Sequence, residues 1–149
     1  MVRAWLVRAD ESTGLAKFER EGFVGIRGGP AEPQVVDADL TGVGDEEIAA
    51  LVARQGLPGN YTAMLRHIVR SMSVGDLVVS PGARDEPDQE VAVGTVASDY
   101  YFHAAEPLRH RRDVHWEGRV PRSAVPTGFW AGKVSALAEV DPADVPRLG

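Results

Sequence analysis

The feature that most constrains the fold is a change of hydrophobic period near residue 75. Before it, apolar side chains recur at the spacing of one helix face, at Tyr61, Met64, Leu65, Ile68, Val69 and Met72. Asn60 precedes this stripe and is a favourable N-cap residue. After the turn at Gly75–Asp76, the run Leu77–Val79 has the length of a buried strand. The sequence therefore predicts a helix that leads directly into a sheet.

Short apolar runs on both sides of this unit predict further strands. They cover residues 3–9, 18–26, 91–96 and 114–120, with a short strand near 35–36. Gly94 lies inside one run, where a glycine indicates a bulge or a close backbone approach. A helix is expected from Asp45, as N-cap, to Arg54, and a short helical stretch over 134–140. This order predicts an α+β fold, a curled mixed sheet of about five to six strands with helices packed against it.

Composition narrows the class of protein. The 149 residues suit one compact domain over 1–149, and the 44% hydrophobic and 26% charged residues are typical of a globular chain. There is no cysteine, which excludes disulfides, thiolate nucleophiles and cysteine-ligated zinc. No run approaches the roughly 18 apolar residues that a membrane span requires. We therefore expect a soluble, cytoplasmic protein with no membrane partner.

The formal net charge of −6 is unevenly distributed. Residues 32–47 contain acidic side chains and no basic one, whereas residues 109–122 are rich in arginine. Arginine suits forked contacts to phosphate, although surface arginines paired with nearby carboxylates explain the pattern equally well. The candidate contacts to a nucleic-acid backbone are Arg66, Arg70, Arg109, Arg111 and Arg112.

Patterns that indicate catalysis or metal binding are weak. His103, His110 and His115 lie close in sequence, but their spacing matches no paired-ligand motif. The acidic residues between 85 and 90 fit a solvated loop better than a nuclease metal site, because no lysine follows them. Neither a nucleophile elbow nor a phosphate loop is present. We therefore expect no catalytic residue, no metal and no cofactor.

Several aromatic residues have polar atoms and stand near the ends of predicted elements: Trp5, Tyr61, Tyr100 and Trp116. Such rings can stack on an unpaired base, and a base taken out of a duplex also needs polar groups that read its edge. Asn60 offers both a donor and an acceptor for that purpose. Burial in the core, and a plain N-cap role for Asn60, are the alternative interpretations.

The order of short motifs resembles a known family. Residues 4–12 resemble the opening strand of the EVE domains, which belong to the PUA-like superfamily. Residues 59–63 and 72–80 resemble that family's central helix, which begins near an Asn-Tyr pair and runs into a Gly-Asp turn and a buried strand. Residues 91–96 are similar to the next strand, and 109–123 to the EVE-like N-terminal domains of Mrr-type modification-dependent restriction proteins.

The resemblance implies a PUA-like pseudo-barrel and a reader of modified nucleic acid rather than an enzyme. The family binds a modified base in an aromatic-lined pocket, which implies methylated DNA as the favoured partner, base flipping, and a restriction or defence role. For restriction, the nuclease would come from a partner or from a missing C-terminal region. By position, the implied pocket residues are Trp5, Asn60, Tyr61 and Ser80, with Trp116 as a candidate wall. The family carries a tryptophan where this chain has Ile26–Arg27, so the implied pocket either binds more weakly or uses Tyr100 instead.

Two other functions remain open at this stage. The first is an RNA-binding module of the same fold that reads a modified RNA base. The second is a small-molecule enzyme of a related PUA-like family, with His115 or Asp76 as the acid or base. A reader distinguishes modified from unmodified oligonucleotides and changes neither, whereas an enzyme turns over its substrate.

Overall fold

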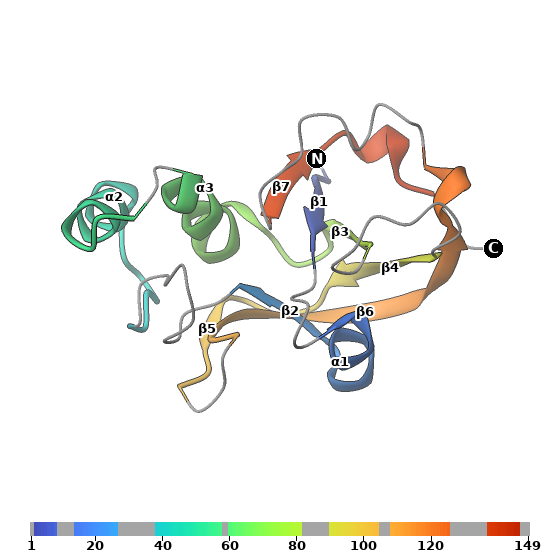
Figure 1. Ribbon diagram of the computed structural model, residues 1–149, viewed down its shortest axis with the longest axis horizontal. Coiled ribbons are helices and arrows are strands. Elements are labelled where there is room, and N and C mark those ends of the chain that lie inside the picture. Colours follow the sequence, from blue (N-terminus) through green and yellow to red (C-terminus); the bar gives the residue numbers. More distant parts are fainter. Residues whose placement is uncertain are drawn as a thin grey trace.

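A computed structural model describes residues 2–8, 14–26, 38–57, 60–81, 90–104, 108–125 and 137–146. Within these ranges the chain forms a mixed, strongly curled half-barrel sheet with a few helices (Figure 1). The strands run in the order β2-β6-β4-β3-β1-β7, and β5 pairs with β6. The predicted α+β class and curled mixed sheet are confirmed, with seven strands rather than five to six.

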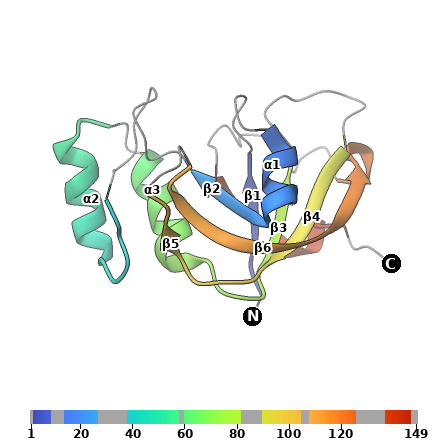
Figure 2. The same ribbon diagram turned by 90° about the horizontal axis from the view of Figure 1, so that it is seen from below.

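The sheet curls around one long strand, β6. The strands are β1 (Ala4–Val7), β2 (Phe23–Ile26), β3 (Leu77–Ser80), β4 (Glu90–Val96), β5 (Tyr101–Phe102), β6 (His110–Pro121) and β7 (Leu137–Val140). The first half of β6 pairs with β2 and β5, and its second half pairs with β4. Because β6 bends between these partners, it connects the two parts of the curled sheet (Figure 2). Only β1 and β3 pair in parallel, among the strands described.

The helices lie on different sides of this sheet. They are α1 (Gly14–Glu21), α2 (Asp45–Arg54), α3 (Asn60–Arg66) and the π-helix η1 (His67–Ser71), with 3₁₀ turns η2 (Arg122–Ala124) and η4 (Pro142–Asp144). Helix α3 lies between α2 and the sheet, and α1 lies against β2 and β6 (Figures 1 and 2). The two predicted helices that begin near residues 45 and 60 are confirmed, although Gly44 rather than Asp45 is the N-cap of α2.

Two local predictions are wrong. Residues 18–21 belong to helix α1 rather than to a strand; Leu15 and Phe18 share one face, and Lys17 pairs with Glu21 over 2.9 Å one turn later. Gly22 ends this helix with φ +70°, a conformation that a side chain disfavours. The predicted helix over 134–140 is a strand over its described part, because residues 137–140 pair with β1. The short strand near residues 35–36 lies outside the described residues.

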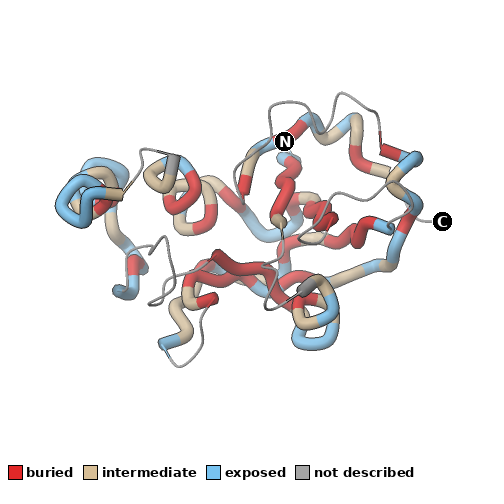
Figure 3. The backbone as a smooth tube through the Cα atoms, viewed as in Figure 1, coloured by how far each residue is buried: buried red, intermediate tan, exposed pale blue. Residues whose placement is uncertain are grey.

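Buried residues run along the strands of the curled sheet (Figure 3), and their side chains form two clusters. The larger cluster joins the apolar stripe of α3 to side chains of β1, α1 and β2, and the smaller one contains Leu6, Val79, Val91 and Val93. The predicted irregularity at Gly94 is confirmed: the register between β4 and β6 shifts there, and a Cβ would lie 2.5 Å from the carbonyl oxygen of His115. That close approach is possible only without a side chain.

Candidate functional site

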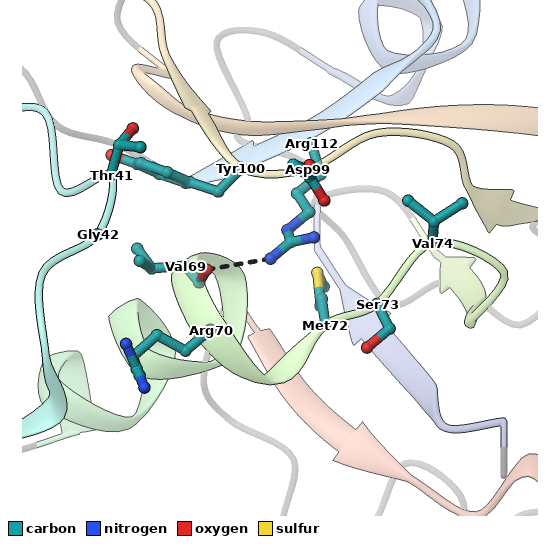
Figure 4. A pocket seen from close by; sticks show the side chains of 10 residues that line it. All are labelled: Thr41, Gly42, Val69, Arg70, Met72, Ser73, Val74, Asp99, Tyr100 and Arg112. Carbon is teal, nitrogen blue, oxygen red and sulfur yellow. Dashed lines mark hydrogen bonds between the residues drawn. The ribbon is translucent and has the colours of Figure 1, made fainter.

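A cavity of about 460 Å³ lies between η1 with the turn that follows it, the segment before β5, and Arg112 of β6 (Figure 4). Its walls are formed by Thr41, Gly42, Val69, Arg70, Met72, Ser73, Val74, Asp99, Tyr100 and Arg112. The volume falls within the roughly 300–1,000 Å³ of typical small-ligand sites. The lining combines apolar side chains with charges of both signs, which is the composition of a site that orients a polar ligand.

The helical wall of the cavity is a π-helical turn. The amide of Met72 donates to the carbonyl of His67 over 2.9 Å, five residues back, instead of four as in an α-helix. π-turns are rare, and within α-helices they occur frequently at functional sites. This turn contributes Val69 and Arg70 to the cavity, so the irregular geometry lies at the candidate site itself.

Arg112 holds this turn against the sheet. Its guanidinium donates to the carbonyls of Ile68 (2.7 Å), Val69 (3.1 Å) and Ser98 (3.3 Å), and the residue is only 4% exposed. The last carbonyls of a helix lack intrahelical partners, so a cation there both satisfies them and complements the helix dipole. Burial lowers the pKa of Arg112, and the nearby charges of Asp99 and Asp76 oppose that shift.

Tyr100 fixes a second wall. Its hydroxyl lies 2.7 Å from His110 Nδ1 and accepts a hydrogen bond from the Leu40 amide over 3.1 Å. The rings of Tyr100 and His110 stack with centroids 5.8 Å apart. Burial raises the pKa of Tyr100 to about 12. The tyrosine therefore stays protonated at neutral pH and holds the segment before α2 against the sheet.

Arg70 and Arg66 stand at the α2 side of the site. Arg70 Nε lies 3.0 Å from Asp45 Oδ1, and its Nη1 donates to the carbonyl of Val43 over 3.3 Å. Arg66 donates to the Asp45 carbonyl over 3.1 Å. Both side chains keep a large exposed fraction, 47% for Arg70 and 39% for Arg66. They are thus accessible to a ligand, although Asp45 already neutralises part of their charge.

Arg111 and Arg112, the candidates for phosphate contact on β6, are buried. Arg111 is 4% exposed, its guanidinium carbon lies 4.0 Å from the centroid of the Phe23 ring, and its Nε donates to the Leu108 carbonyl. Arg112 is equally buried. Neither guanidinium faces bulk solvent, which corrects the expectation that these two residues contact a phosphate backbone. Arg109 is half-buried just before β6.

Trp5 does not line the cavity. It is fully buried, its Nε1 donates to Asp76 Oδ2 over 3.0 Å, and its ring centroid lies 4.9 Å from that of His67. Ser80 is also fully buried, and its Oγ has no hydrogen-bond partner among the described residues. The expectation that Trp5 and Ser80 face a base is therefore corrected, because both are enclosed by the folded sheet.

The remaining candidates are half-buried around the core. Trp116 donates from Nε1 to the Phe18 carbonyl over 2.9 Å, and Tyr61 packs against the larger buried cluster. Burial raises the pKa of Tyr61. Asn60 begins helix α3, and its side chain lies outside the described part of the structure. Of the five predicted pocket residues whose side chains the structure describes, Tyr100 lines the cavity.

Sequence reasoning missed most of the cavity wall. The apolar stripe predicts Val69 and Met72 only as positions on one face of a helix, and no sequence pattern singles out Asp99 as a cavity residue. The helix period does place Val69 and Met72 on the inner face, but no local signal indicates that the helix widens there into a π-turn. Across the described ranges, no three His, Asp or Glu side chains gather as a metal site. Nor does any helix described have the length and apolarity to cross a membrane.

Comparisons with known proteins place the chain by fold and by family. No curated protein matches it. The crystal structure of protein Atu2648 from Agrobacterium tumefaciens is similar, with a TM-score of 0.51 and 10% identity over 96% of this chain and 88% of that chain. The NMR structure of Rpa0253 from Rhodopseudomonas palustris has a TM-score of 0.48 and 13% identity over the same shares. The similarity to Atu2648 is one of fold alone.

The family match covers the candidate site. Residues 37–125 match the model described as "Domain of unknown function (DUF8426)", and this range contains every residue that lines the cavity. The matched range is more than half of the 149 residues. The chain therefore belongs to the family Domain of unknown function (DUF8426).

Proposed function

We propose that this protein is a reader of modified nucleic acid, of the EVE type within the PUA-like superfamily, that binds a modified and preferably methylated DNA base without chemical change. The observation that carries the proposal is the cavity, in which a buried guanidinium, a tyrosine and an exposed carboxylate surround a space of ligand size. The sequence resemblance to EVE domains supports the same function.

A base extruded from a duplex requires apolar contact with its faces and polar groups at its edge. The cavity offers Val69, Met72 and Tyr100 as apolar and aromatic surface. Arg112 and Asp99 supply a donor and an acceptor for the edge. The base site that we propose is therefore lined by the end of η1 and the segment before β5, and not by Trp5.

Contacts to the nucleic-acid backbone are proposed at the exposed arginines beside the cavity. Arg70 lines the cavity wall, and Arg66 lies one helical turn before it. Phosphates that flank a captured base would compete with Asp45 for these two guanidinium groups. A restriction or defence role would require a nuclease partner, because the proposed activity is binding alone.

The alternative of an enzyme that uses Asp76 is less well supported. The Asp76 carboxylate accepts hydrogen bonds from the Arg3 amide, the Trp5 indole and the Ser73 amide, and the residue is 4% exposed. A carboxylate with three donors inside the fold serves to hold elements together. Modified RNA remains the second candidate ligand, because the cavity chemistry described above fits a base from either DNA or RNA.

The test is fluorescence polarisation with matched DNA and RNA oligonucleotides that carry methylcytosine, hydroxymethylcytosine, methyladenine or no modification. We expect a preference of about tenfold, or 1.4 kcal/mol, for one modified DNA strand. Equal or tighter binding of a modified RNA strand would favour the second candidate, and no binding at low salt would exclude the reader function.

Two exposed valines provide a matched pair of variants for the same assay. Val74 is 60% exposed and lines the cavity, whereas Val2 is 48% exposed and lies outside it. Val74→Trp should obstruct the cavity and weaken binding of the preferred strand by about tenfold or more. Val2→Trp makes the same chemical change elsewhere and should leave the affinity unchanged. Equal effects of the two variants would place the ligand outside this cavity.

A further inference from the structure

Arg112 has N–H bonds that its hydrogen bonds to the described residues do not use. A guanidinium carries five N–H bonds. The recorded hydrogen bonds use the Nε donor for Ile68, one Nη2 donor for Val69 and one Nη1 donor for Ser98. One N–H bond is thus left on each terminal nitrogen, and the residue forms part of the cavity wall (Figure 4). Two neighbouring donors are the arrangement that binds two neighbouring acceptor atoms.

No ion pair of this buried group is recorded among the described residues either. In the part of the chain that the structure describes, the only recorded hydrogen-bond partners of Arg112 are backbone carbonyls. A buried cation without a paired anion is costly, so a ligand that offers strong acceptors would be stabilised there. Asp99 lies near enough for its charge to act on the guanidinium, yet it is exposed and lines the same cavity.

Arg112 and Asp99 both line the cavity, so the two unused donors of Arg112 and the Asp99 acceptor lie at its wall. Guanine presents the same set at its Watson–Crick edge, with two N–H donors next to a carbonyl oxygen. Building on the proposed function, we infer that Arg112 and Asp99 imitate the edge of guanine and select a cytosine-type base. Arg112 donates to N3 and O2 of the cytosine, and Asp99 accepts from its exocyclic amino group.

Other bases match this arrangement less well. Uracil and thymine present an oxygen where cytosine has its amino group, and that oxygen would face the Asp99 carboxylate. Adenine has a single acceptor beside its amino group, so one Arg112 donor would stay unpaired. Guanine would direct its own donors at the guanidinium. Sites built on buried polar groups reject analogues that leave those groups unpaired.

The test uses single-stranded oligothymidylates that differ only at one central position: cytosine, 5-methylcytosine, adenine, guanine, thymine or an abasic site. We expect the better of the two cytosine strands to bind at least about tenfold more tightly than the adenine, guanine and thymine strands. The abasic strand separates the base edge from a backbone phosphate as the source of the acceptor atoms. An abasic strand that binds as tightly as the cytosine strands would overturn the inference.

The Asp99→Ala variant tests the acceptor directly, because Asp99 is exposed and its loss should leave the fold intact. The preference for cytosine over thymine should fall to less than about threefold. Glu47→Ala, which removes an exposed carboxylate from helix α2, should keep the full preference. An unchanged preference in Asp99→Ala overturns the inference. If the wild type prefers a modified base that is not a cytosine, the inference fails while the proposed reader function stands. If it binds no strand of this or the preceding assay, both the inference and the reader function fail.

Discussion

The indole nitrogen of Trp5 donates a hydrogen bond to Asp76 Oδ2 over 3.0 Å, across 71 positions of sequence. The same carboxylate accepts from the amides of Arg3 and Ser73. Asp76 therefore ties the first strand to the turn that follows helix η1, at the parallel pairing of β1 with β3. This contact explains why Trp5 belongs to the core and not to a ligand site.

Asp76→Ala should lower the free energy of unfolding by about 3 kcal/mol, because three buried or partly buried donors lose a charged acceptor. Urea unfolding monitored by tryptophan fluorescence measures the change. Asp99→Ala removes an exposed carboxylate and should change stability by less than about 0.5 kcal/mol. Similar losses in the two variants would show that the hydrogen bonds to Asp76 contribute little.

Arg112→Met should destabilise the protein by about 3 kcal/mol, since the carbonyls of Ile68 and Val69 would lose their side-chain partner. Amide hydrogen exchange should accelerate in the π-turn before it does so in β4. Arg119→Met serves as the comparison, because Arg119 is 42% exposed and pairs with Glu19 at the surface. That variant should cost at most about 1 kcal/mol. Unchanged exchange in the π-turn of Arg112→Met would contradict this role.

Tyr100, which is buried, and Tyr101, which is partly buried, predict a loss of stability at alkaline pH. Burial raises the pKa of Tyr100 and of Tyr101 to about 12, so the folded state retains protons that the unfolded state has released. Their contribution is complete below the unfolded pKa of 10.0 and is lost as the pH rises toward 12. Absorbance at the phenolate band and urea unfolding at pH 9 to 11 follow both effects. Tyr100→Phe should flatten the pH dependence; an equally steep decline would assign it to other groups.

His67 predicts a loss of stability at acidic pH. Desolvation is the main cause that lowers the pKa of His67 below its usual 6.5, and the Arg3 charge adds to it, while the Glu139 charge opposes it. The folded state therefore favours the neutral ring. Its contribution is complete above pH 6.5 and is lost as the pH falls through the folded pKa.

The NMR titration of the His67 ring protons should give a midpoint below the usual 6.5. His67→Gln should reduce the decline in stability below pH 6.5, which urea unfolding at several pH values measures. A His67 midpoint at or above 6.5 would show that burial does not disfavour its charged form.

Asp45→Asn should strengthen binding of the preferred oligonucleotide if Arg66 and Arg70 contact phosphates. The substitution removes the carboxylate that lies 3.0 Å from Arg70 Nε and keeps a polar side chain at the start of α2. The salt dependence of log K should steepen by about one phosphate contact. Glu46→Gln removes the same charge from the same helical turn and controls for net charge. If both variants give the same slope of log K against log salt, the change arises from the net charge of the protein and not from Arg66 and Arg70.

Strong periodicity made some elements predictable from the sequence. The stripe from Tyr61 to Met72 fixes a helix because only one face of it can be buried, and Leu77–Val79 is too short and apolar for anything but an interior strand. Gly94 predicted a close backbone approach because a glycine inside a strand pattern leaves room for one. The structure agrees, since an added Cβ there would meet the backbone of His115. The predictions for residues 18–21 and 137–140 are wrong because such short apolar patterns fit both the helical and the strand period. Packing of α1 made the first segment helical, and pairing with β1 made the second a strand.

Residue patterns along the chain were enough to predict the α+β class, the helix from residue 60 with its following strand, and the arginine-rich segment of β6. The exposure of those arginines depends on tertiary packing: β6 begins at His110, so Arg111 and Arg112 lie within the sheet. Tertiary packing also decided that Trp5 is buried with Asp76, and that Tyr100, Arg112 and Asp99 meet at one cavity. Trp5 and Asp76 are 71 positions apart, and the cavity brings residues 99, 100 and 112 against Val69 and Met72 of an earlier helix. Local residue preferences carry no information about which distant groups will pack together.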